Sequence, residues 1–355
     1  MTSSFWQGKS VLVTGHTGFK GSWLCLWLSL LGADIYGFSL DPPTTPNLFE
    51  IAHISELLLA DKRGDVRDLE TLSSYIIEIQ PEIIFHLAAQ PLVRYAYHHP
   101  LDTFAVNVMG TANLLEVIRQ CSFVKTVIIV TTDKVYANRN WVYPYREIDP
   151  LGGQDPYSAS KAMVEMLVDS YRSSFFYNEN SPKLFTVRAG NVIGGGDWSM
   201  DRLIPDCVRA LIGNIPIELR YPQAIRPWQH ILEPLYGYLL LAEKSSIWHD
   251  ISYLTAWNFG SSSTQEKTVQ EVVESLFRLW SKPIMINLVQ SINFHESETL
   301  RLDSSQAIDK LGWHPHWSVD QGLEVTVSWY KTWLDGEDMQ KFTFKQISDY
   351  QAMLP

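Results

Sequence analysis

Short apolar runs alternate with helix-like segments along the first half of the chain, and this alternation predicts a parallel sheet. Strands are predicted where Val, Ile and Phe cluster, at residues 10–14, 34–39, 83–87, 126–131 and 184–188. Helices are predicted between them, at about residues 19–31, 67–79, 102–120 and 156–176. Repeated alternation of strand and helix is typical of an α/β, doubly wound parallel sheet with helices on both faces.

The pattern changes after Arg188, where a glycine-rich loop is followed by a mainly helical region. Here the sequence predicts one more strand, at Ala256–Phe259, and helices near residues 202–213, 233–245, 268–280, 304–311 and 318–335. We therefore expect a sheet domain of residues 1–188 with a return segment at about 228–260. A smaller mixed α/β lobe is expected from residues 189–227 and 261–355.

Composition narrows the class of protein. The chain has 355 residues, of which 46% are apolar, so it can bury a large core and is not disordered as a whole. It carries 28 Lys+Arg against 39 Asp+Glu, and the resulting net charge of −11 argues against nucleic acid or an anionic membrane as a partner. Three widely spaced cysteines fit no disulfide framework, and we see no secretory leader or membrane span, so a cytoplasmic location is expected. The histidine pairs at 98–99 and 314/316 lack matching cysteine or carboxylate clusters, so no metal site is expected.

A glycine-rich turn joins the first predicted strand to the first long helix. Glycines at this place allow a tight turn and a close approach of the backbone to a pyrophosphate, while the helix N-terminus offers free N–H groups. Alone, the spacing also occurs in ordinary turns, but its place between strand and helix favours a dinucleotide-binding, Rossmann-type domain. The predicted cofactor-binding residues of the turn are Gly15, Thr17, Gly18, Phe19 and Gly21.

The end of the second strand bears on which dinucleotide binds. Asp41 lies twenty residues after Gly21, where a carboxylate would bind a ribose hydroxyl and repel a 2′-phosphate. No arginine lies near this strand end in the sequence, and both features favour NAD over NADP. The alternative is a solvated loop acid beside prolines. Further cofactor contacts are expected after the next two strand positions, at Asp65, Val66, Leu87, Ala88 and Ala89.

A tyrosine and a lysine one helical turn apart form the candidate catalytic pair. Tyr157 and Lys161 share one face of the helix that starts after Asp155, and the ammonium is expected to lower the tyrosine pKa. Such a tyrosine can take a proton from a substrate hydroxyl while hydride leaves the same carbon. The spacing arises by chance in many helices, but the preceding strand ends in Thr131 and Thr132, at the edge where ligands bind in open parallel sheets. Thr131, Tyr157 and Lys161 are also expected to contact the cofactor.

The glycine turn, the strand-end threonine and Tyr-x-x-x-Lys, in this order, resemble the extended short-chain dehydrogenase/reductase superfamily over nearly the whole chain. Longer strings resemble the CDP-glucose 4,6-dehydratase family within it. They are Gly15-His16-Thr17-Gly18-Phe19-Lys20-Gly21-Ser22-Trp23-Leu24, Leu40-Asp41-Pro42-Pro43-Thr44, Asn47-Leu48-Phe49-Glu50, Gln90-Pro91-Leu92-Val93-Arg94, Arg188-Ala189-Gly190-Asn191-Val192-Ile193-Gly194-Gly195-Gly196-Asp197-Trp198 and Arg226-Pro227-Trp228-Gln229-His230.

This resemblance implies conversion of CDP-D-glucose to CDP-4-keto-6-deoxy-D-glucose and water, in deoxysugar and lipopolysaccharide O-antigen synthesis. It implies a tightly held NAD and a homodimer formed through the helices near 102–120 and 156–176. Thr132 would be the hydroxyl partner of Tyr157. Asp133 would protonate the leaving C6 hydroxyl. Lys134 could take the C5 proton only if it were deprotonated, so the base for that step stays open.

The resemblance also implies substrate-binding residues: Arg226, Arg202 and Arg301 in the later lobe, Asn191 in the loop after strand 184–188, and Arg94 in the sugar pocket. Arginine suits bidentate contacts to a diphosphate, and Arg94, Asn191, Arg202, Arg226 and Arg301 are the predicted ligands. For each arginine a surface salt bridge is the alternative. For the whole protein, the alternatives are a nucleotide-sugar 4-epimerase, another nucleotide-sugar dehydratase, and a non-catalytic NAD-binding sensor. An inverting UDP-N-acetylglucosamine dehydratase would share the Asp-Lys pair but lack the tyrosine.

Overall fold

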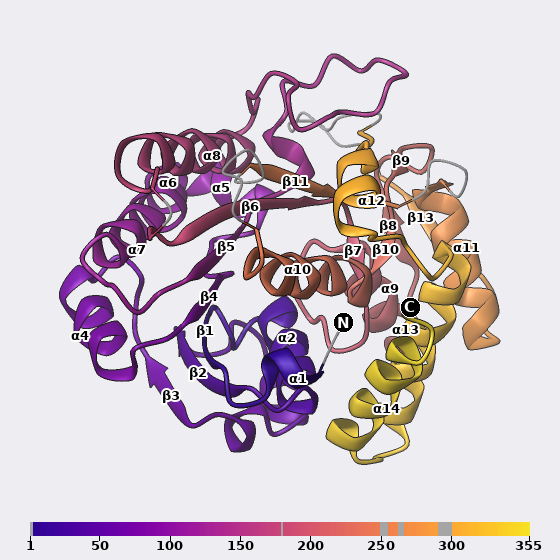
Figure 1. Cartoon of the computed structure of the whole chain (residues 1–355). Helices are drawn as coiled ribbons and strands as arrows, with labels where there is room; N and C mark the ends of the chain where they lie inside the picture. The colour runs from indigo at the N-terminus through magenta and orange to yellow at the C-terminus, as the bar shows by residue number, and fades with distance from the viewer. Residues whose placement is uncertain (1–2, 179, 249–254, 262–265, 290–299) are drawn as a thin grey trace.

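A seven-stranded parallel sheet runs through the centre of the protein (Figure 1). The computed structural model describes residues 3–178, 180–248, 255–261, 266–289 and 300–355. The strand order is β11 (Ala256–Phe259), β6 (Lys183–Ala189), β5 (Thr126–Val130), β4 (Ile83–His86), β1 (Ser10–Thr14), β2 (Asp34–Ser39) and β3 (Ala60–Arg63). Six of these strands are the predicted ones, and the expected α/β fold class is confirmed.

The seventh strand, β3, was not predicted because it has no apolar pattern. Its four residues are Ala60-Asp61-Lys62-Arg63, and none of them is buried. It lies at the edge of the sheet and pairs in parallel with β2, which sets Ser39 opposite Arg63. The pairing therefore brings an arginine to the carboxyl end of β2, where the linear sequence has none.

Helices cover both faces of the sheet, and the strand residues alternate between two cores. On one face α4 (Leu69–Ile79), α7 (Gly110–Ile118) and α8 (Pro156–Phe175) pack on Leu12, Ile84 and Val127. On the other face α2 (Phe19–Leu30) and α10 (Leu232–Ser245) pack on Val11, Phe85 and Ile128. In Figure 1 α4, α7 and α8 lie on the left flank, while α2 and α10 lie in front of the sheet.

The single helix predicted at 102–120 is interrupted in the structure. It consists of α6 (Pro100–Phe104), a π-helical turn, η2 (Ala105–Met109), and α7. In the π-helical turn Asn107 is buried and its side chain donates to Ser160 in α8 at 2.8 Å and to the carbonyl of Gln90 at 3.1 Å. The wider turn thus ties this segment to the helix that carries Tyr157.

The later part of the chain builds a second, mainly helical lobe, at the right of Figure 1. Its longer elements are α9 (Leu203–Gly213), α11 (Val269–Trp280), α12 (Ser305–Leu311), α13 (Val319–Leu334) and α14 (Met339–Gln351), with β8 (Ile217–Leu219) paired to β13 (Ile286–Leu288). The shorter elements of the protein are α1 (Ser3–Trp6), α3 (Leu48–Ile51), η1 (Ile54–Leu57), α5 (Val93–His98), η3 (Asp133–Val135), β7 (Val192–Ile193), β9 (Ile225–Arg226), β10 (Gln229–His230) and β12 (Lys267–Thr268).

The sequence did not predict α14. Part of the predicted return segment (249–254) and parts of the predicted smaller lobe (262–265 and 290–299) lie outside the described residues. Among the helices that are described, none is both long and apolar enough to cross a membrane. The described residues also contain no group of three His, Cys, Asp or Glu side chains placed to hold a metal ion.

Candidate active site

A cavity of about 730 Å³ opens at the carboxyl ends of the strands, where the chain order reverses between β1 and β4. This is where ligands bind in open α/β sheets. Every residue predicted to bind the cofactor or to act in catalysis lines it: Gly15, Thr17, Gly18, Phe19, Gly21, Asp41, Asp65, Val66, Leu87, Ala88, Ala89, Thr131, Thr132, Asp133, Lys134, Tyr157 and Lys161.

The glycine turn has the shape that a dinucleotide needs. Gly15 has φ of +73°, and a Cβ on it would stand 2.7 Å from the backbone nitrogen of Ala88. A Cβ on Gly21 would lie 2.2 Å from the carbonyl oxygen of Gly15, so both positions require glycine. Gly18 is the N-cap of α2 and supplies no capping side chain. The first N–H groups of α2 are therefore available to a pyrophosphate, and the turn fits NAD.

An arginine lies near the end of β2, where the sequence predicted none. Arg63 lies beside Asp41, with Nε 3.3 Å from the carboxylate, because β2 and β3 pair in parallel. Arg63 also pairs with Asp61 at 3.1 Å, and Asp61 in turn contacts the ring of His16 at 2.8 Å. Asp41 is thus paired with a cation, and the end of β2 does not carry the isolated negative charge that the sequence suggested.

Tyr157 and Lys161 lie on α8 and reach the cavity together with Thr132. Lys161 is buried and its ammonium donates to the carbonyl of Val130 at 3.0 Å, while burial lowers its pKa to about 8. Burial also raises the pKa of Tyr157 to about 12, although a hydrogen bond with Thr132 opposes the shift. The expected lowering of the tyrosine pKa is therefore wrong for the free site, because desolvation outweighs the hydrogen bond with Thr132 and the charge of Arg202.

Asp133 begins the short helix η3 and is almost fully buried beside Thr132. The Thr132 hydroxyl donates to Oδ1 of Asp133 at 2.9 Å. Burial raises the pKa of Asp133, and the adjacent Lys134 opposes this rise without cancelling it. A carboxyl with a raised pKa can stay protonated and donate a proton, which is what a general acid requires.

Four of the five predicted substrate ligands line the cavity: Arg94, Asn191, Arg202 and Arg226. Arg94 pairs with Asp201 at 2.8 Å and Arg202 with Asp197 at 3.0 Å. Arg226 lies close enough to Asp133 to lower its pKa. The fifth, Arg301, pairs instead with Glu266 and is not among the described residues that line the cavity.

One cavity residue that the sequence reasoning missed is Lys20, from the glycine turn itself. Its ammonium lies 5.8 Å from the ring centre of Tyr238, and Lys161, Asp133 and Arg202 are close enough to influence it. Burial lowers the pKa of Lys20 to about 7. A lysine between two of the glycines, at a position that would face the ligand, was the signal that could have identified it.

Comparison with known proteins agrees with this geometry. The family model described as GDP-mannose 4,6 dehydratase matches residues 12–326. A CDP-glucose 4,6-dehydratase from Salmonella typhimurium is 47% identical over 353 residues, which are 98% of each chain. A dTDP-glucose 4,6-dehydratase from Haemophilus influenzae is 27% identical over 90% of this chain and 97% of that relative.

Solved structures share the fold. A dTDP-glucose 4,6-dehydratase from Bacillus anthracis in complex with NAD has a TM-score of 0.78, with 24% identity, and covers 95% of this chain and 100% of that one. A UDP-glucose 4-epimerase from Thermotoga maritima with UDP-glucose also has a TM-score of 0.78, with 21% identity, and covers 91% of this chain and 99% of that one.

A Rossmann-type sheet with a glycine turn, a strand-end threonine and a Tyr-x-x-x-Lys helix at one cavity defines an extended short-chain dehydrogenase/reductase. Within that superfamily, the chain belongs to the family of the CDP-glucose 4,6-dehydratases.

Proposed function

We propose that this protein is an NAD-dependent lyase that converts CDP-D-glucose to CDP-4-keto-6-deoxy-D-glucose and water, within deoxysugar and O-antigen synthesis. One observation carries the assignment to a dehydratase. A buried carboxyl, Asp133, accepts a hydrogen bond from Thr132, which also contacts the phenol of Tyr157. Oxidation at C4 needs only the tyrosine and its lysine, whereas loss of water needs an additional acid, and here that acid is buried beside them.

NAD would lie along the glycine turn, with its pyrophosphate on the N-terminus of α2 and its adenosine ribose beside Asp41 and Asp65. When bound, it would supply redox chemistry, as acceptor of a hydride from C4 of the sugar and donor of that hydride to C6. Thr131 and Lys161 line the same cavity at the end of β5, so both can orient the nicotinamide ribose.

Tyr157 is the group that takes the C4 hydroxyl proton onto its phenolic oxygen. In the free site burial keeps the phenol protonated, so the phenolate must be stabilised as substrate and cofactor bind. Lys161 supplies a buried positive charge one helical turn away, and Thr132, whose own proton is donated to Asp133, makes a hydrogen bond with the phenol of Tyr157. The chain thus brings the base, its cation and a hydroxyl to one place on the cavity wall.

Asp133 donates the proton that the leaving C6 hydroxyl needs. Its carboxyl is held by Thr132, so a single hydroxyl fixes both the acid and the base. The 4-keto group acidifies the proton on C5, removal of this proton lets water leave, and a proton returns to C5 when hydride is added at C6. Lys134 lines the cavity next to Asp133 and is the candidate for this step. A Lys134→Ala enzyme that keeps full turnover would remove it from the mechanism.

The nucleotide would be held by the later lobe. We propose that residues 1–188 with the return segment 228–260 bind NAD, while residues 189–227 and 261–355 bind the nucleotide sugar. Asn191, Arg202 and Arg226 line the cavity and can bind the diphosphate, while Arg94, from the sheet domain, lines it and can contact the sugar. Arg301 stays a predicted ligand and would have to leave Glu266 to reach it.

The test is a comparison of four nucleotide sugars. Purified protein with NAD is incubated with CDP-, dTDP-, GDP- or UDP-glucose, and the keto sugar is measured by its absorbance in alkali. We expect the signal with CDP-glucose above all others. A changed sugar without a keto signal would indicate an epimerase, and binding of NAD without any change in the sugar would indicate a sensor.

We also propose a cytoplasmic homodimer formed through α6, η2, α7 and α8. These helices expose apolar side chains that a monomer has no reason to keep in water: Leu101 (84% exposed), Met109 (56%), Met163 (45%) and Met166 (64%). Sedimentation of a Met163→Glu/Met166→Glu variant tests this, because two charges in the interface should yield monomers. An unchanged sedimentation coefficient would place the interface elsewhere.

A further inference from the structure

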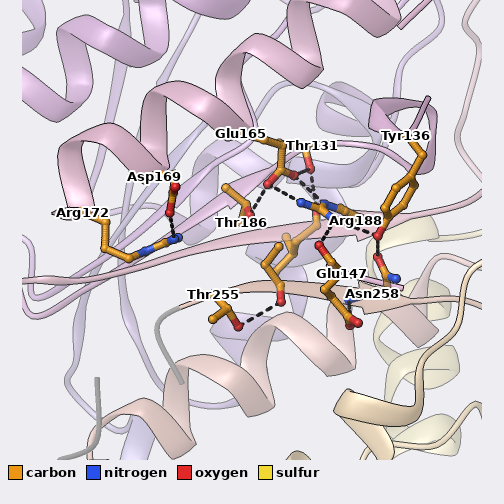
Figure 2. A network of polar contacts seen from close by, with 12 residues as sticks. Thr131, Tyr136, Glu147, Glu165, Asp169, Arg172, Thr186, Arg188, Thr255 and Asn258 are labelled. Carbon is orange, nitrogen blue, oxygen red and sulfur yellow. Dashed lines mark hydrogen bonds and ion pairs between the residues drawn. The ribbon is translucent and has the colours of Figure 1, made fainter. Parts of the chain in front are cut away.

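A buried ion pair, Glu165–Arg188, contacts Thr131 and Tyr136, on either side of the proposed catalytic segment in the sequence (Figure 2). Nε and Nη2 of Arg188 in β6 donate to the two carboxylate oxygens of Glu165 in α8, both at 2.9 Å. The two side chains are only 3% and 4% exposed. Burial of such a pair costs much of what the attraction returns, so stability alone is a weak reason for its presence. The groups that it binds suggest another role.

The carboxylate of Glu165 fixes the residue that comes immediately before the catalytic segment. Thr131 donates its hydroxyl to one oxygen of Glu165 at 2.5 Å, and Thr186 donates to the other at 2.6 Å. Burial favours the neutral acid, but Arg188 and these hydroxyls outweigh it and hold the pKa of Glu165 below its usual value. The carboxylate is therefore charged and accepts a full set of donors from two strands.

The guanidinium of Arg188 fixes the other end of the same segment. Its Nη1 donates to the phenol oxygen of Tyr136 at 2.7 Å, and the guanidinium stacks on that ring at 4.9 Å. Tyr136 in turn donates to the amide oxygen of Asn258 in β11 at 2.8 Å. The amide nitrogen of Asn258 donates to the backbone carbonyls of Tyr145 and Asp303, so the chain of contacts continues to the later lobe.

We propose that the Glu165–Arg188 pair is a positioning device that holds Thr131 and Tyr136, the two flanks of residues 132–134, so that Thr132 and Asp133 stay aligned with Tyr157. This inference rests on the proposed dehydratase function. Glu165 is one turn beyond Lys161 on α8, and Arg188 is the penultimate residue of β6, which pairs with β5, the strand that precedes Thr131.

The same carboxylate has an electrostatic effect on Lys161. Burial lowers the pKa of Lys161, and the charge of Glu165 raises it again. The other charged or titratable groups close to this ammonium are Lys20 from α2, His86 from β4 and Tyr157 from its own helix. Loss of the negative charge at Glu165 therefore leaves a lysine that loses its proton at lower pH.

Three variants test the proposal, and each removes or weakens a different part of the contact network. Thr131→Val removes the first flank contact with little change in shape, Tyr136→Phe removes the second, and Glu165→Gln weakens both. The control is Asp169→Asn, which breaks the 3.0 Å pair of Asp169 with Arg172 on the outside of the same helix. For each variant, kcat and KM for CDP-glucose, NAD binding, the melting temperature and the pH dependence of kcat are measured.

If the pair positions the segment, Thr131→Val and Tyr136→Phe lower kcat by about 10- to 100-fold, since displacements of about 1 Å have such effects. In Tyr136→Phe, KM and NAD binding stay within about twofold, because transition-state alignment and not binding is lost. Thr131 is also a predicted cofactor contact, so kcat of Thr131→Val is compared at saturating NAD. In Glu165→Gln the decline in kcat that follows deprotonation of Lys161 moves to lower pH; this decline is separate from the one set by Asp133 and is measured in the Asp133→Asn background. The Asp169→Asn control keeps the wild-type values.

A purely structural pair would give the opposite set of results. The melting temperature of the Thr131→Val and Tyr136→Phe variants would fall while kcat per folded molecule stayed at the wild-type value, and this would overturn the proposal. If Glu165→Gln does not fold, the other two variants still distinguish a positioning role of the pair from a purely structural one. A wild-type enzyme without activity on CDP-glucose would refute the proposed function itself, which is a different outcome from full activity in the variants.

Discussion

Replacement of Asp133 by asparagine separates the two halves of the proposed reaction. Asparagine has the same shape and keeps an oxygen that accepts the hydrogen bond from Thr132, now 2.9 Å long. It cannot donate an acidic proton to the leaving hydroxyl. Because burial raises the pKa of Asp133 and so disfavours its charged form, the neutral amide should not destabilise the fold at neutral pH.

The expected loss follows from the usual contribution of a general acid. Such a group accelerates its step by roughly 10²- to 10⁴-fold, which corresponds to about 3 to 5 kcal/mol. Formation of keto sugar should fall by that factor in Asp133→Asn. Reduction of the bound nicotinamide on addition of CDP-glucose should persist, because oxidation at C4 depends on Tyr157. The comparison variant Tyr157→Phe should lose this reduction as well as the product.

The assay follows nicotinamide absorbance during a single turnover, with keto sugar measured in alkali at the end. The pH dependence of product formation provides a second test of the role of Asp133. An acid must be protonated, so product formation by the wild-type enzyme should decline as the pH rises through the raised pKa of Asp133. That limb should disappear in the asparagine variant. Normal turnover by Asp133→Asn would show that the acid assignment is wrong.

Two further predictions concern the cofactor site and the loop after β6. Asp41→Ala removes the carboxylate that pairs with Arg63, so the guanidinium can bind a 2′-phosphate. The preference for NAD over NADP, measured by titration of each cofactor, should then fall by roughly 10- to 100-fold. An unchanged ratio of the two affinities would exclude Arg63 from this role. Gly195→Ala would place Cβ 2.0 Å from the indole of Trp329 and should lower the free energy of unfolding by about 1–3 kcal/mol in urea titrations. Gly213→Ala, where no atom outside its immediate neighbours lies closer than 3.7 Å to the new Cβ, is the control and should not be destabilised in this way.

Much of the fold follows from the sequence because buried parallel strands are continuous apolar runs. Strand β3 was not predicted because it has no such apolar run. Its residues Asp61 and Lys62 are exposed at the edge of the sheet. Helix α14 was missed for a related reason. Its buried face includes Thr343 and Gln346 beside Ile347, so polar residues interrupt the apolar stripe.

The candidate site could be predicted where its residues are contiguous in the sequence. The glycine turn and Tyr157 with Lys161 are local patterns, and all of them line the cavity. The Glu165–Arg188 pair joins residues 23 positions apart in separate elements, and the sequence gives no reason to pair them. The sequence predicted a lowered pKa for Tyr157, but burial raises it. The spacing of residues on a helix indicates which charges are neighbours, but it does not show how far a side chain is removed from water.

The two outer strands determine how the protein can associate with other chains. An edge strand normally offers free backbone groups to which a second chain can add. On β11 these groups are occupied by side chains: Asn258 N–H donates to Glu147 at 2.9 Å, and the carbonyl of Ala256 accepts from Gln306 at 3.0 Å. At the opposite edge β3 is short and charged. Both edges are thereby made less suitable for addition of another strand, and this favours the proposed dimer through helix faces over one through the sheet.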